Sequence, residues 1–333
     1  MGDITSPSRF HRRWRIAATA LVALLCLEGS VRLLSVRLQP VEPWPSTDYT
    51  RHEQQLAAAG DHVDTLVVGS SSVGVAVRPA DLPEGGTGYN YWLAGPSIRS
   101  VTDLTSEILL DRVRPRTVLI GVTMREFNEG PSQRAHHTAL VESYAFKDET
   151  GSATVIDDAD EVLRSVSALA RYRDVLRDPV RLVDQIETGP LEPETMAADG
   201  HLADRGGDQM EGEPAAHLQQ ERDAMVDYSL ASSDVDALDR LLSILAERKI
   251  AAIVVNLPVS AKFIGLVDGG QTSQDEFTDR VRSVSEKHSA LWVDSMVEPW
   301  DDEWFADVNH LNDRGAARLE PILKAALTRV QGR

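Results

Sequence analysis

The sequence predicts an α/β fold of three layers, in which helices cover both faces of a parallel five-stranded sheet. Five short apolar segments alternate with segments whose apolar residues have helical spacing, which is the pattern of βαβ units. The apolar segments are nearly continuous, as expected for strands that are buried on both faces. The chain has 333 residues, of which 42% are apolar and 26% charged, so it can form a globular core of considerable size.

The expected strands and helices follow one another along most of the chain. The strands are predicted at residues 64–69, 88–95, 116–123, 250–260 and 290–296. The helices are predicted at residues 100–113, 234–249, 273–288 and 312–330. A doubly wound sheet of this kind binds ligands outside the carboxyl ends of its strands, so the residues that directly follow each strand are the first candidates for a site.

The N-terminus contains an apolar run from Ile16 to Leu27 that follows four arginines and resumes, after Glu28, as far as Leu38. Twelve residues are fewer than the roughly 20 that a membrane span needs, so a cleaved signal peptide and a soluble helix remain alternatives. No cleavage site of the A-x-A type follows Leu27, which favours an uncleaved signal anchor over residues 16–38. Because basic residues are denser before the run, residues 1–15 are expected in the cytoplasm and the remainder outside.

The rest of the chain divides into a proline-containing linker at 39–60 and a domain at 61–331. The alternation of strands and helices breaks at about 125–230, which is acidic, rich in glycine and proline, and helical only around 160–178. We interpret it as an insertion, either a lid over the site or a solvated excursion without a role.

Charge and cysteine content exclude some classes of partner and site. The formal net charge of −18 argues against a nucleic-acid partner, since phosphate binding needs a basic surface. The single cysteine, Cys26, excludes an intrachain disulfide and a cysteine-based zinc site.

The stretch Gly69-Ser70-Ser71-Ser72-Val73 ends the first predicted strand. Val73 stands where a G-x-S-x-G nucleophile elbow needs its second glycine, and no lysine follows for a phosphate-binding loop. Ser71, at the tip of the turn, is the serine placed to face a ligand. Ser70 is expected to bond to the loop, and Ser72 to satisfy a free N–H in the next helix. A plain polar turn is the alternative.

The stretch Asp307-Val-Asn-His310 precedes the last predicted helix and follows the last strand. A serine nucleophile needs a base, and the base needs a carboxylate that fixes its tautomer. Asp307 and His310 can meet both needs within one turn, at the same edge of the sheet as Ser71.

Three further candidates follow the second and third strands. The backbone N–H of Gly95 can bind an oxyanion, although the residue also fits a plain turn. Thr123 and Glu126 lie near the same edge, but Glu126 has no partner that would make a glycosidase pair. The adjacent His136 and His137 lack a third ligand, which favours a surface position over a metal site.

Together these motifs resemble the SGNH (GDSL-type) hydrolase superfamily over residues 64–330, with the insertion outside the resemblance. This resemblance implies a flavodoxin-like fold with Ser71 as nucleophile and Asp307 and His310 as its partners. It also implies an oxyanion hole that contains the N–H groups of Ser71 and Gly95. The third family block departs here, because Thr123 occupies the place of an oxyanion-binding asparagine. Thr123 is the candidate third donor to the oxyanion, since its hydroxyl can donate a hydrogen bond, but its side chain is shorter than that of asparagine.

The first block of the family is Gly-Asp-Ser, and here it is Gly69-Ser70-Ser71. This variant, the N-terminal anchor and the His310-Leu-Asn sequence resemble a membrane-anchored branch of the superfamily, which is involved in alginate O-acetylation and teichoic-acid D-alanylation. This implies extracytoplasmic hydrolysis or transfer of acyl esters on a cell-envelope polysaccharide, with an acyl donor and a multi-pass membrane O-acyltransferase as partners. No metal or organic cofactor is implied. The alternative is a non-catalytic binding or assembly component, which the missing asparagine supports.

Overall fold

The chain divides into two units in the computed structural model, which describes residues 7–38, 46–59, 62–82, 87–128, 130–189, 196–202 and 215–332. The sheet unit comprises residues 43–151 and 194–333. The N-terminal unit comprises residues 1–42 and 152–193.

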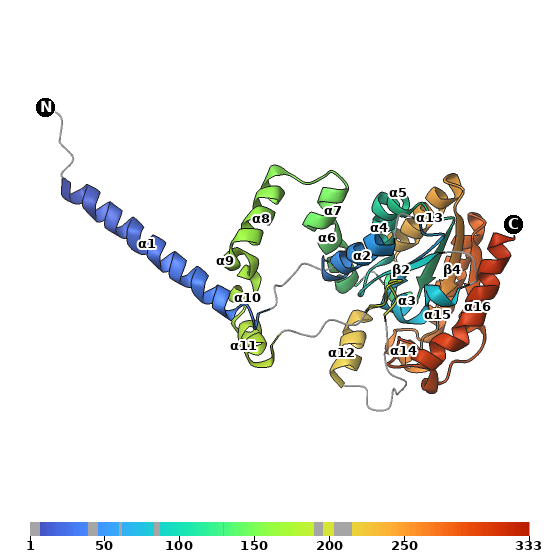
Figure 1. Cartoon of the computed structure of the whole chain (residues 1–333). Helices are drawn as coiled ribbons and strands as arrows, with labels where there is room; N and C mark the ends of the chain where they lie inside the picture. Colours follow the sequence, from blue (N-terminus) through green and yellow to red (C-terminus); the bar gives the residue numbers. More distant parts are fainter. Residues whose placement is uncertain are drawn as a thin grey trace. The chain divides into compact units, whose positions relative to one another are not determined.

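The sheet unit contains a five-stranded, entirely parallel sheet of order β2-β1-β3-β4-β5 (Figure 1). The strands are β1 (Thr65–Ser70), β2 (Gly88–Leu93), β3 (Thr117–Val122), β4 (Ala251–Asn256) and β5 (Leu291–Asp294). All five predicted strands and the predicted fold class are therefore confirmed. Most strand side chains are buried at successive positions, such as Val118, Leu119 and Ile120, because helices cover both faces.

Helices form a layer on each side of the sheet (Figure 1). One layer contains α4 (Ile98–Leu104), α13 (Ser232–Glu247) and α15 (Gln271–Lys287), and the other α3 (Ser71–Ala76) and α16 (Asp313–Gln331). The helix predicted at 100–113 is divided, since a π turn (η2, Thr105–Leu109) separates α4 from α5 (Leu110–Val113). The remaining short helices near the strands are η1 (Pro79–Asp81), α14 (Ala261–Leu266), η4 (Ser295–Val297) and η5 (Asp302–Trp304).

The edge strand β2 is covered by a helix at a place where the sequence predicts a linker. Helix α2 (Ser46–Ala59) packs on β2 and buries Tyr49 and Leu56 in the main core, so the prediction of a linker over 39–60 is wrong for 46–59. The prolines at 40, 43 and 45 suggested an extended chain, but the apolar residues that follow them have helical spacing. Residues 39–45 lie outside the described part of the chain.

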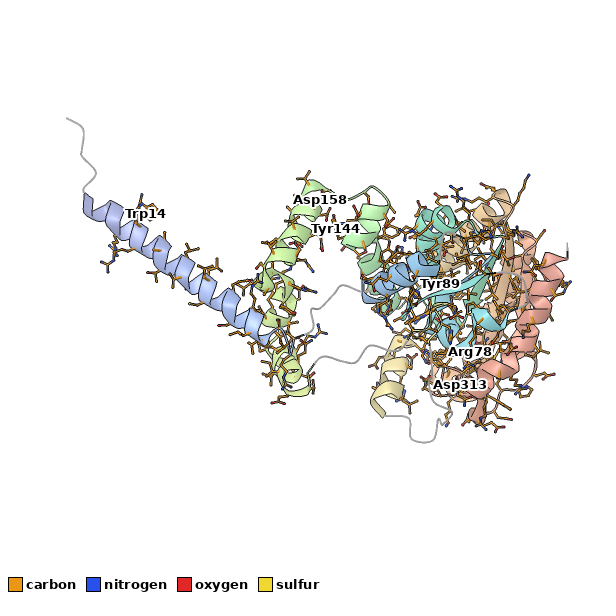
Figure 2. The ribbon with its side chains drawn as sticks, in the orientation of Figure 1. Trp14, Arg78, Tyr89, Tyr144, Asp158 and Asp313 are labelled. Carbon is orange, nitrogen blue, oxygen red and sulfur yellow. The ribbon has the colours of Figure 1, made fainter. Side chains whose placement is uncertain are left out.

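His52 of α2 is fully buried against the aromatic side chains of β2, where Figure 2 labels Tyr89. Its ring stacks on Tyr91 at 4.2 Å between centroids. Its Nδ1 lies 3.0 Å from the Tyr89 hydroxyl, and its Nε2 donates to the Trp92 carbonyl at 2.8 Å. Burial lowers the pKa of His52 to about 3, so the ring is neutral at physiological pH.

The predicted insertion contributes to both units. In the sheet unit it forms η3 (Met124–Phe127), α6 (Pro131–Glu142), α7 (Tyr144–Glu149) and α12 (Ala215–Ala224). In the N-terminal unit it forms α8 (Val155–Val166), α9 (Ala168–Arg171), α10 (Arg173–Arg177) and α11 (Pro179–Thr188). The helix expected around 160–178 is therefore present as α8–α10, whereas residues 190–195 and the acidic residues 203–214 lie outside the described part.

The N-terminal unit is built on α1 (Pro7–Leu34). Its stretch Arg12–Leu34, of 23 residues, contains an 18-residue window of mean hydropathy 1.8 and is long and apolar enough to cross a membrane, a property that signal sequences share. Trp14, labelled in Figure 2, is among its exposed side chains. Beyond Glu28, Val31 packs with Tyr172 and Val175 in a small separate core.

We predict that His52 makes the sheet unit sensitive to acid. Its pKa is about 3 in the folded chain and 6.5 in the unfolded chain, so the unfolded chain binds more protons between these values. The free energy of unfolding should therefore fall by several kcal/mol as pH drops from 6.5 to 3, since each pKa unit is worth about 1.4 kcal/mol. Urea unfolding of the wild type and His52→Gln, followed by tryptophan fluorescence across this range, measures the difference.

The matched control is His62→Gln, because the side chain of His62 is 65% exposed. This variant should keep the wild-type pH profile, whereas His52→Gln should flatten it. Parallel profiles for the wild type and His52→Gln would contradict the prediction.

Candidate active site

The strand register brings the candidate residues to one edge of the sheet. Ser70 at the end of β1 pairs with Leu93 at the end of β2, so Ser71 and Gly95 follow neighbouring strand ends. The end of β3 lies on the other side of β1 and leads directly into Thr123. The loop that carries Asp307 and His310 follows β5 and leads into α16.

Two glycines and one valine fix the turn between β1 and α3. A Cβ atom on Gly121 of β3 would lie 2.1 Å from Cγ2 of Val73, and one on Gly69 would lie 2.6 Å from the same atom. Only hydrogen at both positions lets the Val73 side chain pack over β1 and β3. Val73, which departs from the standard elbow, thus holds the start of α3 against the sheet.

The three serines have different partners. Ser70 is buried and accepts from the Ser72 N–H at 3.3 Å, which caps α3. Ser72 is also buried, and its hydroxyl donates to the Asn309 carbonyl at 3.1 Å. The hypothesis that the Ser72 hydroxyl serves a free helix N–H is therefore wrong, because Ser70 fills that place. Ser71 is partly exposed, and its Oγ lies 2.8 Å from Nε2 of His310.

Asp307 holds His310 on its other side. Nδ1 of His310 lies 2.9 and 2.8 Å from the two oxygens of the Asp307 carboxylate. The same carboxylate accepts from the backbone N–H groups of Asn309 at 3.0 Å and His310 at 2.8 Å, which fixes its orientation. Because a carboxylate only accepts, Nδ1 donates to it and Nε2 is left to accept the Ser71 proton. The hydroxyl, imidazole and carboxylate thus form a continuous chain of hydrogen bonds.

Thr123 lies at the expected edge, but its donors are engaged. Its hydroxyl and its backbone N–H both donate to Oε2 of Glu126, at 2.7 and 2.6 Å, in a capping box at the start of η3. The geometry therefore leaves the expected oxyanion donor Thr123 without a hydroxyl proton for a ligand. Glu126 is buried and serves to cap η3.

Gly95 follows β2 in a left-handed conformation with φ +58°, which favours glycine. A Cβ atom there would lie 3.0 Å from Cε1 of His136 and 3.4 Å from a guanidinium nitrogen of Arg125. His136 donates through Nδ1 to the Gly95 carbonyl, and burial lowers the pKa of His136. Nε2 of His137 instead lies 2.7 Å from Oδ2 of Asp103. Both histidine side chains are partly buried, so they are not an exposed surface pair. Within the described ranges, no cluster of three or more acidic, histidine or cysteine residues could hold a metal ion.

A buried ion pair beside the site was not predicted from the sequence. Arg125 Nε lies 3.0 Å from Oε2 of Glu221 in α12, and both side chains are almost fully buried. The same Glu221 oxygen accepts from Nδ2 of Asn309 at 3.3 Å, next to His310. Arg125 and Glu221 are 96 residues apart, and no local pattern indicates this pairing.

A family model matches part of the chain. The family model described as DltD protein, of teichoic-acid D-alanylation, matches residues 212–321, a third of the chain. The matched segment contains Glu221, Asp307 and His310 but not Ser71. No curated protein matches the chain.

We predict that Gly121→Ala displaces the start of α3, because the new methyl group would overlap Val73 and approach Leu257 to 3.0 Å. Overpacking of this kind costs about 1–3 kcal/mol. Adding Val73→Ala should recover part of this loss, so the double variant should be more stable than the sum of the single effects. Thermal unfolding of the four proteins measures the coupling.

The control is Gly265→Ala in α14, where an added Cβ meets nothing within 4 Å. This variant should be as stable as the wild type or slightly more stable. Strict additivity of Gly121→Ala and Val73→Ala would show that their contact does not limit the turn.

Proposed function

We propose that the sheet unit is an acyl-ester hydrolase or O-acyltransferase in which Ser71 is the nucleophile. The observation that carries the proposal is the hydrogen-bond chain from the Ser71 hydroxyl through His310 to Asp307, with distances of 2.8 to 2.9 Å. This arrangement supplies a base for the hydroxyl and a carboxylate for the resulting imidazolium.

The reaction would proceed in two steps. Oγ of Ser71 attacks the acyl carbonyl carbon while Nε2 of His310 takes the hydroxyl proton. His310 then gives this proton to the departing alcohol as its bond to the acyl carbon breaks, leaving an acyl ester on Ser71. In the second step, water or a glycan hydroxyl attacks this ester, with His310 again accepting and returning a proton. Asp307 stays ionised throughout and stabilises the imidazolium.

The proposed oxyanion hole has two donors, the backbone N–H groups of Ser71 and Gly95. Ser71 is the first residue of α3, where helix N–H groups have no partner within the helix. With the Thr123 hydroxyl bound to Glu126, a third donor is missing. Loss of one such donor costs about 2.7–4 kcal/mol in other enzymes, so hydrolysis of simple esters should be slow.

The proposed location is outside the cytoplasmic membrane. Residues 16–38 would anchor the chain with residues 1–15 in the cytoplasm, consistent with the arginines that precede the apolar stretch. The DltD match favours a cell-envelope polymer of the teichoic-acid type, esterified with D-alanine, as substrate. A multi-pass membrane O-acyltransferase is the proposed partner that supplies or receives the acyl group.

A second candidate is a non-catalytic assembly component of such an envelope-modifying complex. The observation that favours it is the engagement of both Thr123 donors by Glu126. The two candidates differ in whether Ser71 reacts.

We predict that a fluorophosphonate probe labels the full chain at Ser71. Ser71→Ala should abolish labelling, because no other serine side chain that the structure describes is bonded to His310, and His310→Gln should slow it by several orders of magnitude. Ser70→Ala and Ser72→Ala are the matched controls and should keep most of the labelling. Mass spectrometry of the labelled peptide identifies the residue.

Absence of label on the wild type, with a known serine hydrolase labelled in the same tube, would favour the assembly component. Label on Ser70 or Ser72 would contradict the assignment of Ser71. Circular dichroism of each variant separates loss of reactivity from loss of fold.

We also predict that the chain is an integral membrane protein with the sheet unit outside. The protein should stay in the membrane during alkaline carbonate extraction, and protease added outside intact cells should degrade the sheet unit. Release of a mature form that lacks residues 1–30 would instead support the signal-peptide alternative.

A further inference from the structure

The apolar side of helix α8 in the N-terminal unit is exposed on the surface of the protein. Its apolar residues recur with helical spacing and form one side of the helix. Their exposed fractions are 83% for Val155, 81% for Ile156, 62% for Val162, 50% for Leu163 and 62% for Val166. A helix on the surface of a soluble domain normally buries this side.

The polar side of α8 makes the contacts with the rest of the unit. The Asp160 carboxylate accepts from Arg173 of α10 at 2.6 and 3.1 Å and from Arg164 at 3.0 Å. The pair with Arg173 holds α8 against α10 through charged groups, while the pair with Arg164 lies within α8, and the apolar side faces away from both. The orientation is therefore the reverse of that in an ordinary amphipathic surface helix.

The end of α8 is fixed to the apolar helix α1. Glu28 of α1 accepts from the Ser167 hydroxyl at 2.9 Å and from the N–H groups of Ala168 and Leu169 at 2.8 and 3.0 Å. Arg32 adds a bond to Glu28 at 2.8 Å and another to the carbonyl of Val166, the last residue of α8. A carboxylate within an apolar span needs such partners, because lipid offers none.

These bonds determine the level along the axis of α1 at which α8 ends. Glu28 lies six residues before Leu34, where the apolar stretch ends, and six residues correspond to about 9 Å at 1.5 Å per residue. The junction of α8 and α9 is thus near one end of the stretch that can span a membrane. Figure 1 shows α8 running across the direction of α1, not alongside it.

We propose that α8 lies in the interface of the lipid bilayer, with the side that carries Val155 and Leu163 among the acyl chains. The proposal rests on the membrane placement of α1 but not on a reactive Ser71. The occupant is the bilayer, because the exposed apolar side belongs to a helix whose end is bonded to a helix of membrane-spanning composition. Since the polar side of α8 is acidic, apolar burial drives the contact and anionic lipid is not required.

The test uses the full chain in phosphatidylcholine vesicles, in a Cys26→Ser background that removes the single native cysteine. An environment-sensitive NBD fluorophore is attached to Leu163→Cys or to the matched control Glu161→Cys. These sites are two residues apart and therefore about 200° apart around the helix. Lipids with a nitroxide on the acyl chain report contact with the bilayer interior, and iodide reports contact with water.

The Leu163 probe should have blue-shifted emission and be quenched several-fold more by the lipid nitroxide than the Glu161 probe, with the reverse order for iodide. Equal access of iodide to both probes would overturn the proposal. A blue-shifted Leu163 probe that the nitroxide does not quench would show a protein occupant and would also overturn it.

Flotation of the vesicles separates the inference on α8 from the proposed membrane placement of α1. If the chain does not float with the lipid, the membrane placement of α1 falls and the inference on α8 falls with it. If the chain floats and the Leu163 probe reports water, only the inference on α8 is overturned. Neither outcome affects labelling of Ser71.

Discussion

The candidate site depends on one hydrogen bond, between the Ser71 hydroxyl and His310, which joins segments 239 residues apart. Each partner is held by its own support. Val73, packed over Gly69 and Gly121, fixes the turn that presents Ser71. Backbone N–H groups orient the Asp307 carboxylate, which in turn orients His310. The Ser72 hydroxyl then ties the two segments directly through the Asn309 carbonyl, so the geometry at Ser71 is set from both sides.

The parts of this structure that could be predicted from the sequence are those with a local signal. The five strands are continuous apolar segments, and burial on both faces of a parallel sheet requires that pattern. Ser71, Asp307 and His310 follow strands whose carboxyl ends must share one edge, so their meeting could be expected once the sheet was recognised. Helix α2 was missed because three prolines directly before it outweighed its own spacing.

The remaining features could not be predicted, because they depend on distant partners. Thr123 has the right position for a donor, but whether its hydroxyl is available depends on the rotamer of Glu126, which the sequence does not specify. Arg125 and Glu221 meet only because α12, on the far side of the insertion, folds back to the sheet edge. The insertion was interpreted as one polar segment, whereas its helices belong to two units that bury different surfaces.

The buried pair of Arg125 and Glu221 connects the insertion to the candidate site. A buried pair contributes little net stability, but removal of one partner leaves an uncompensated charge and costs about 3–5 kcal/mol in other proteins. Here Arg125 follows the strand that ends at Thr123, and Glu221 also binds Asn309, the residue before His310. The pair therefore links the β3 loop, with Gly95 beside it, to the loop that carries His310. Any rearrangement of α12 would change the environment of both loops together, so the segment that interrupts the sheet pattern also constrains the candidate site.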